Sequence, residues 1–291
     1  MKKFFSSSII WIFAVIGNLV VQFIGAMALV TSPKSMHVIV QYAIMALVQA
    51  VNVFIVLTVR KKRDFVSPYT FRRPDVTVAI KSTVLGIITF VGMYLISQYV
   101  FEFLVNIGVK SAPLDISGWY IVPALITTVI FAPVGEEAVF RCSITYGLKN
   151  GKTAVAVIVS ALAFTLMHMS PMQMVYQFVL GVMLAVLIIR SQNVVYPIIA
   201  HATSNLVVVL LSLVPLPAVP LYKPLTVVVT VLVFVLCVMI AFVILKSIKP
   251  KEESVDVKED SVQDGTEKIF GIVAYVAGAL ICFAVWVTAF F

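Results

Sequence analysis

Two adjacent glutamates, Glu136 and Glu137, lie well inside a long apolar stretch and are followed by Arg141. Residues four apart share a helix face, so Glu137 and Arg141 are expected to form an ion pair. Glu136 is turned away from Glu137 by about 100° in a helix of 3.6 residues per turn. A buried carboxylate without a charged partner holds a proton more tightly, which suits a general base. The cluster by itself fits a structural ion pair between helices equally well.

The next apolar stretch carries Phe164 and His168, which are also four residues apart and should stack on one helix face. Glu136 lies 15 residues before the turn expected near Gly151, and His168 lies 17 residues after it. At a rise of about 1.5 Å per residue, both reach a similar depth. A carboxylate and an imidazole at one depth on adjacent helices can share a water molecule. A single histidine near a helix end is otherwise more often structural.

A third pair, His201 and Asn205, again has the spacing of one helix face. Two neutral donors on one face can stabilise a developing oxyanion, although interhelical hydrogen bonding is an alternative role. His201 is only nine residues past the turn expected at Gln192. Upright ideal helices would separate it from His168 by more than about 10 Å. Tilting, or a kink at Pro197, would be needed to bring the two histidines together.

The helices that position these residues are expected to lie in lipid. The 291-residue chain is 62% hydrophobic and only 12% charged, with a mean hydropathy of +1.10. Soluble domains carry about a quarter charged residues, so no single aqueous core accounts for this composition. The net charge of +8 comes from basic residues in short loops, which fits the positive-inside rule rather than nucleic-acid binding. Membrane lipid is therefore an expected partner, nucleic acid is not, and the oligomeric state is left open.

Nine apolar segments without period-2 alternation predict an all-α, polytopic membrane helix bundle. The first is long for a cleaved signal sequence, despite Ala26-Met27-Ala28, and is interpreted as an uncleaved span. The segments are Ile9–Val30, Val38–Val59, Val76–Phe101, Trp119–Tyr146, Thr153–Met169, Met172–Ile189, Val194–Val214, Leu225–Leu245 and Ile269–Phe291.

The chain divides at its polar stretches. Residues 1–118 hold the N-terminal spans, 119–214 the candidate catalytic core, and 215–245 the eighth span after a proline-rich turn. Residues 246–268 form a mixed-charge stretch, interpreted as a cytoplasmic linker to a last helix at 269–291. That helix is expected to be an addition to an eight-helix body. The three cysteines, Cys142, Cys237 and Cys282, are interpreted as buried apolar residues; a nucleophilic Cys142 is disfavoured because no base adjoins it.

The order EExxxR, FxxxH and HxxxN on three membrane segments resembles the CAAX-protease and bacteriocin-processing (CPBP, or Abi) family. Its eukaryotic member is the type II CAAX prenyl endopeptidase. All three motifs are intact, and the resemblance covers roughly Trp119 to Val214. The motif residues are Glu136, Glu137, Arg141, Phe164, His168, His201 and Asn205.

The resemblance implies an eight-helix core with an intramembrane cavity. It implies that Glu136 and His168 activate water for peptide-bond hydrolysis and that His201 and Asn205 stabilise the oxyanion. Glu137, Arg141 and Phe164 would organise the site. Because the family has also been described as metalloproteases, zinc is an alternative, but no HExxH pattern is present and metal-independent hydrolysis is favoured.

The favoured function is an intramembrane endopeptidase acting on a peptide or a membrane-anchored protein in the cell membrane. Short loops and the lack of a soluble domain suggest a compact bacterial member, for which a prenylated substrate is not expected. A non-catalytic immunity or scaffold protein of the same fold is the main alternative, and a proton-relaying transporter is a weaker one. The intact motifs favour the enzyme, since a degenerate member would be expected to have lost one.

The loops also predict an orientation. The stretch Arg60–Arg63 with Arg72 and Arg73 should be cytoplasmic, and alternation then places the N-terminus inside and Phe291 outside. The outer loops would hold only Lys34, Lys110 and Lys223. Reporter fusions at Asp64 and after Phe291 are expected to fall on opposite sides of the membrane. Signals from the same side would mean that the number of spans is wrong.

Overall fold

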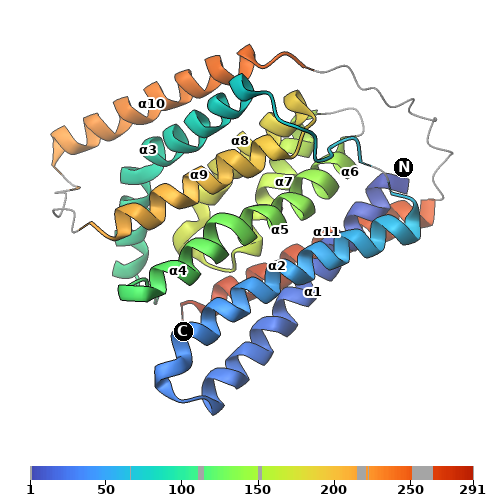
Figure 1. Cartoon of the computed structure of the whole chain (residues 1–291), viewed down its shortest axis with the longest axis horizontal. Helices are drawn as coiled ribbons and strands as arrows, with labels where there is room; N and C mark the ends of the chain where they lie inside the picture. Colours follow the sequence, from blue (N-terminus) through green and yellow to red (C-terminus); the bar gives the residue numbers. More distant parts are fainter. Residues whose placement is uncertain are drawn as a thin grey trace.

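The structure is a computed structural model that describes residues 2–65, 67–110, 115–149, 153–214, 221, 223–250 and 265–290. It is a bundle of helices, and eight of them are long and apolar enough to cross a membrane, which confirms the predicted all-α, multi-pass membrane architecture (Figure 1). The part of the chain described contains no strand, apart from an isolated bridge between Thr70 and Asn193. The turn near Gly151, residues 215–220, linker residues 251–264 and Phe291 lie outside the described residues.

Each apolar segment of the sequence corresponds to a helix. The fourth segment is one compound helix, Gly118–Leu148, in which α-helical turns alternate with two wider π-helical ones. The helices are α1 Lys2–Thr31, α2 His37–Arg63, α3 Val76–Asn106, α4 Ile121–Ala124, α5 Ala132–Val139, α6 Tyr146–Leu148, α7 Thr153–Met167, α8 Met174–Ser191, α9 Val195–Ser212, α10 Pro224–Ser247 and α11 Gly265–Thr288.

The loops that carry the basic residues meet at one end of the bundle. At that end Arg63 lies 3.9 Å from Glu267 at the start of α11, and the Lys3 ammonium lies 5.2 Å from the ring of Tyr146. Arg190 donates hydrogen bonds to the carbonyl groups of Lys246 and Ile248, both at 3.0 Å. The N-terminus and the end of α11 lie at opposite ends of the bundle (Figure 1). Eight long helices and the shorter α7 together would make nine alternating crossings, which places the two ends on opposite sides in this way. The side of the membrane on which each end lies stays a prediction.

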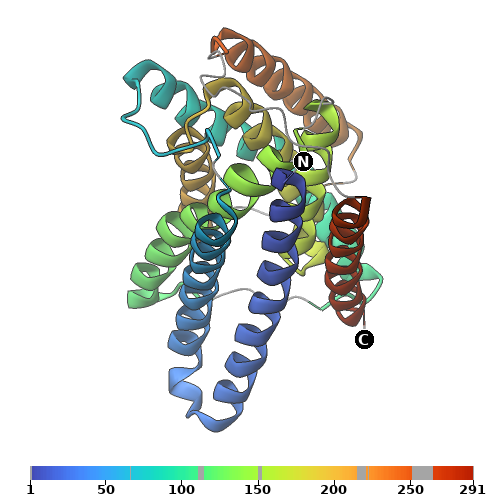
Figure 2. The ribbon, with the colours of Figure 1, turned by 90° about the vertical axis from the view of Figure 1, so that its right-hand side faces the viewer.

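Small residues let the helices approach closely, as is usual in membrane bundles. A Cβ on Gly86 of α3 would lie 2.3 Å from the carbonyl oxygen of Ala200 in α9, so only glycine fits there. The added helix α11 lies beside α1 (Figure 2), where Gly278 leaves room for the Trp11 indole. Trp11 Nε1 in turn donates to the carbonyl of Tyr275 at 3.2 Å. α10 packs on α3 and is otherwise almost entirely exposed, as expected of a helix that faces lipid.

Two features of the fold set the depth of the central residues. α7 has only 15 residues, or about 22 Å of helix, whereas the hydrocarbon core of a bilayer is about 30 Å thick. Its end at Met167 therefore lies inside the bundle. The turn between α8 and α9 is also buried: Gln192 and Asn193 are each 3% exposed and lie under the segment around Thr70 and Arg72. α9 thus begins below the surface of the bundle.

Candidate active site

The centre of the bundle holds a fully buried ion pair. Arg141 Nε lies 3.0 Å from Glu137 Oε2, and both side chains have no exposed surface. Arg141 also lies 4.4 Å from the centre of the Phe164 ring and 3.5 Å from the carbonyl oxygen of Gly181 in α8. The spacing of Glu137 and Arg141 thus gives the expected pair, which the cation–π contact connects to α7.

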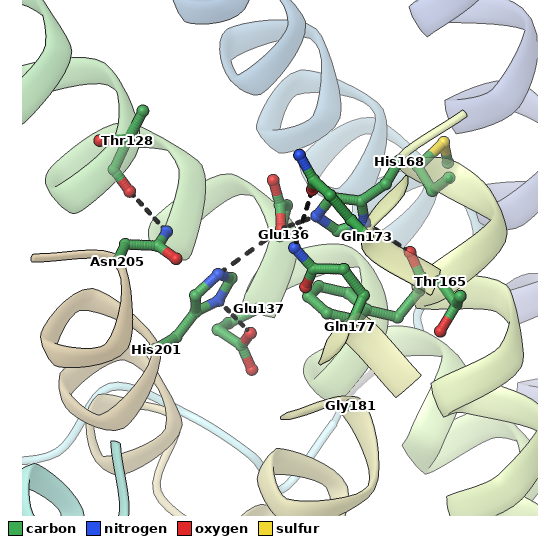
Figure 3. A network of polar contacts seen from close by, with 12 residues as sticks. Thr128, Glu136, Glu137, Thr165, His168, Gln173, Gln177, Gly181, His201 and Asn205 are labelled. Atoms are coloured by element: carbon green, nitrogen blue, oxygen red, sulfur yellow. Dashed lines mark hydrogen bonds and ion pairs between the residues drawn. The ribbon is translucent and has the colours of Figure 1, made fainter. Parts of the chain in front are cut away.

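His201 links both glutamates from α9 (Figure 3). Its Nδ1 lies 2.9 Å from Glu137 Oε1, and its Nε2 lies 3.8 Å from Glu136 Oε2. Only 2% of the side chain is exposed. Because Glu137 also pairs with Arg141, it is an ionised acceptor, and His201 must carry its proton on Nδ1. Glu137 therefore fixes the orientation of the imidazole.

His168 approaches the same oxygen of Glu136 from the end of α7. Its Nε2 lies 3.9 Å from Glu136 Oε2, while its Nδ1 lies 2.8 Å from the carbonyl oxygen of Phe164. The carbonyl can only accept, so this imidazole also carries a proton on Nδ1. The rings of Phe164 and His168 meet edge to face at 4.8 Å, and Phe164 contacts His201 in the same way at 5.7 Å. The expected contact of Phe164 with His168 is present, with perpendicular rather than stacked rings.

Glu136, His168 and His201 consequently present three acceptors to one point. When the imidazoles are neutral, each directs a nitrogen lone pair at Glu136 Oε2, which has no hydrogen-bond partner of its own. Distances of 3.8 and 3.9 Å are too long for direct hydrogen bonds but suit a bridging water molecule. A water molecule at this point can donate its two hydrogens to two of the three acceptors.

The two histidines meet although counting along upright helices separates them. The reason is the depth of the chain turns. The expected separation of more than about 10 Å holds only if the turn at Gln192 lies level with the other turns. This turn is buried, so α9 starts deeper in the bundle. In addition, the His168 side chain points back toward its own helix and its Nδ1 reaches the carbonyl of Phe164. Both effects shorten the distance between the imidazoles.

Asn205 lies in the same cavity, but the structure joins it to the compound helix rather than to His201. Its Nδ2 donates to the carbonyl oxygen of Thr128 at 2.7 Å. Thr128 belongs to the π-helical segment Leu125–Phe131, which precedes the two glutamates. Such wide turns are frequent at functional sites. One amide hydrogen of Asn205 remains for another acceptor. No residue pattern in the sequence predicted this π-helical segment.

A chain of side-chain amides extends from α1 and α2 to Glu136. Asn18 donates to Asn52 at 3.1 Å, Asn52 donates to Gln49 at 3.2 Å, and Gln49 donates to Glu136 Oε1 at 3.2 Å. Asn18 Nδ2 also donates to the carbonyl of Ala14 at 2.6 Å. A carbonyl only accepts, so this contact fixes the direction of all the amides in the chain. Gln49 therefore presents its NH₂ group to Glu136.

These three amides were not among the residues predicted for the site. The signal was available, because Asn18, Gln49 and Asn52 are polar residues inside the first two apolar segments. Gly135 permits the contact: a Cβ there would lie 2.4 Å from Gln49 Oε1. α2 can thus approach α5 at the position just before Glu136. Gln49 occupies Oε1 of the carboxylate and leaves Oε2 to face the imidazoles.

A cavity of about 770 Å³ surrounds this cluster, which is within the usual range for ligand sites. Glu136, His168, His201 and Asn205 all line it, whereas Glu137 and Arg141 lie behind its wall. It is formed by segments of α1, α2, α3, the compound helix, α8 and α9, together with the residues that follow α7. The four predicted catalytic residues thus share one open space.

Neither a metal centre nor a cysteine nucleophile is indicated at this cavity. Within the described ranges, no group of three or more His, Cys, Asp or Glu side chains is arranged to hold a metal ion. The expectation of hydrolysis without a metal stays a prediction. Cys142 is buried, and its thiol donates to the carbonyl of Tyr69 at 3.2 Å, outside the cavity.

Residues 118–207 match the family model described as type II CAAX prenyl endopeptidase Rce1-like. The match confirms the suspected family resemblance. It supports a peptidase in general, since the family is one of proteases. The matched segment carries all seven motif residues, whereas α1, α2, α3, α10 and α11 lie outside it. No curated protein and no solved structure matches the chain.

Replacing Arg141 by alanine is expected to damage folding more than Glu136→Gln does. Arg141→Ala leaves Glu137 buried without its cation, and breaking a buried pair costs about 3–5 kcal/mol. It also removes the contact with the Phe164 ring. Glu136→Gln keeps the shape of the side chain and removes a costly charge. Melting temperatures of the two variants in detergent test this order, and equal values would contradict the importance of the pair.

Gln49→Leu is expected to lower the melting temperature of the protein in detergent, because it removes the hydrogen-bond donor to Glu136 Oε1. A carboxylate oxygen that loses its hydrogen bond inside a protein costs about 1–3 kcal/mol. Gln22→Leu is the matched control, since Gln22 lines the same cavity and contacts Met169 Sδ instead. Equal melting temperatures for the two variants would refute the role of Gln49.

Proposed function

We propose that this protein is an intramembrane endopeptidase that hydrolyses a peptide bond in a membrane-associated peptide or protein. The observation that carries the proposal is the convergence of His168 Nε2 and His201 Nε2 on Glu136 Oε2, at 3.9 and 3.8 Å, in an open cavity. This geometry suits a water molecule held between a carboxylate and imidazole nitrogens. The family match over the same residues supports peptide hydrolysis as the reaction.

In the proposed reaction, Glu136 accepts a proton from water, and His168 orients the same water through its Nε2 lone pair. The resulting hydroxide attacks the carbonyl carbon of the scissile peptide bond, and the carbonyl oxygen becomes an oxyanion. The C–N bond then breaks, and the amine takes up the proton held by Glu136. Gln49 contributes by keeping the second carboxylate oxygen, Oε1, occupied. A positioned base of this kind typically accelerates a reaction by about 10²–10⁴-fold.

His201 and Asn205 would stabilise the oxyanion in different ways. Asn205 offers the amide hydrogen that Thr128 does not use. His201 has its proton on Nδ1, so it donates from Nε2 only if it enters the reaction already protonated, as an imidazolium. Glu136 and His168 alone then accept hydrogen bonds from the water. Glu137, at 2.9 Å, would stabilise that positive charge. The Glu137–Arg141 pair thereby acts through His201 rather than on the substrate.

A purely structural role accounts poorly for the cluster. Three acceptors that face one point without a donor destabilise a folded protein, because buried polar groups without partners cost about 1–3 kcal/mol each. Glu136 Oε2 is such a group. A scaffold or immunity protein would be more stable with an apolar residue at this position. Local arrangements that oppose stability are typical of functional sites.

The substrate is first identified by comparing the membrane proteomes of cells that carry the wild-type protein with those of cells that carry Glu136→Gln. The proposal predicts that the purified protein cleaves this substrate in detergent or liposomes. Glu136→Gln should reduce cleavage by at least about 100-fold, since it removes the base. Exhaustive chelation should leave the wild-type rate unchanged. Lys62→Ala is the control, because Lys62 is exposed in the last turn of α2 and does not line the cavity.

Two results would contradict this mechanism. Unchanged proteomes and an unchanged cellular phenotype with folded Glu136→Gln would show that catalysis is not the function and favour an immunity or scaffold role. Loss of cleavage on chelation that stoichiometric zinc restores would replace the metal-free mechanism with a metal-dependent one.

A further inference from the structure

The cavity extends from Glu136 into the half of the bundle that is farther from the basic loops. Its lining residues on the long helices lie near the level of Glu136 or in the halves farther from the basic loops; they include Gln22 of α1, Met45 of α2, Gln98 of α3 and Ser212 of α9. Gln22 and Gln98 are exposed. The lining residues from Met167 to Gln177 belong to α7, to the short 3₁₀ helix Pro171–Gln173 and to α8, and they lie at the same far end of the bundle.

Below Glu136, toward the basic loops, the bundle is closed. Phe140, Arg141 and Phe164 are each no more than 1% exposed. The π-helical segment Phe140–Thr145 is buried along its whole length, and Tyr69 from the loop between α2 and α3 covers it with no exposed surface. A substrate reaching Glu136 from the basic end would have to displace this packing.

The basic residues indicate which side of the membrane the open end faces. The closed end carries Lys3, Arg60–Arg63, Arg72, Arg73, Lys149, Arg190 and Lys246, whereas the open end carries Lys34, Lys110 and Lys223. An excess of Lys and Arg marks the cytoplasmic side of short loops. The cavity therefore opens away from the cytoplasm.

The lining also restricts what can bind. None of the described residues that line the cavity is Lys or Arg, and its only acidic residue is Glu136. A free C-terminal carboxylate near the scissile bond would be buried without a cation, which is unfavourable. The uncharged polar residues are mostly amides, among them Gln22, Gln98, Gln173 and Gln177. A side-chain amide both donates and accepts hydrogen bonds, so it matches a peptide unit.

We infer that the substrate reaches Glu136 from the extracytoplasmic side, as an uncharged internal stretch of polypeptide whose backbone the amides bind. The inference deepens the proposed function. Its description of the bound polypeptide as a substrate rests on that proposal. The access route and the binding preference can be measured without turnover. A failure of peptide hydrolysis is therefore distinguishable from a failure of this inference.

The access route is tested with single cysteine substitutions and a membrane-impermeant charged maleimide, with the labelled position identified by mass spectrometry. Gln98→Cys and Met45→Cys, at the mouth and inside the cavity, should be labelled in intact cells. Lys62→Cys, in the last turn of α2 at the basic end, should be labelled only after permeabilisation. Labelling of Lys62→Cys but not Gln98→Cys in intact cells would reverse the orientation. Labelling of Gln98→Cys without Met45→Cys would show that the cavity is closed on that side.

The binding preference is tested by protection of Met45→Cys in a Glu136→Gln background, which excludes turnover. A short synthetic peptide of Ala, Val and Gln, blocked at its N-terminus, is compared as the C-terminal amide and the free acid. Lys62→Cys, at the basic end of α2 and outside the cavity, serves as the reference. The amide should slow labelling of Met45→Cys severalfold and at least as well as the acid. Protection by the free acid alone, or by neither peptide, would overturn the inferred substrate class.

Discussion

The arrangement of this protein depends on placing an ionised arginine and its carboxylate partner inside a membrane bundle. Arg141 and Glu137 have no exposed surface, so each would be costly to bury alone. The pair is supported by the Phe164 ring, the Gly181 carbonyl and His201 Nδ1, which belong to three other helices. Because each of these contacts requires a defined position of its helix, satisfying the ion pair aligns α5, α7, α8 and α9.

Glu136 has the opposite character one residue earlier in the chain. It faces the cavity, accepts one hydrogen bond from Gln49 and leaves Oε2 without a partner between two imidazoles. The two adjacent carboxylates differ by about 100° of helix rotation, so that Glu137 is paired inside the bundle and Glu136 faces the cavity. The amide chain from Asn18 shows that the N-terminal hairpin also shapes the site, although α1 and α2 lie outside the segment that matches the family model.

Depth in the bundle is set by irregular elements as much as by helix length. The short α7 ends inside the bundle, the turn before α9 is covered by a loop, and two π-helical segments flank the glutamates. Non-helical backbone at such depth is tolerated where protein surrounds it or where it lines a cavity. These departures from regular helices bring His168 and His201 to one oxygen atom and leave Asn205 bonded to Thr128.

The sequence alone was sufficient for the helical membrane architecture, the Glu137–Arg141 pair and the common depth of Glu136 and His168. These properties follow from composition and from residue spacing within a helix or across one hairpin, which are local. The approach of His201 to Glu136, the amide chain to Gln49 and the position of the cavity depended on the tertiary structure. They arise from where helices begin, tilt and pack, and these quantities result from contacts between residues far apart in the chain, such as Thr70 with Asn193 and Gly135 with Gln49.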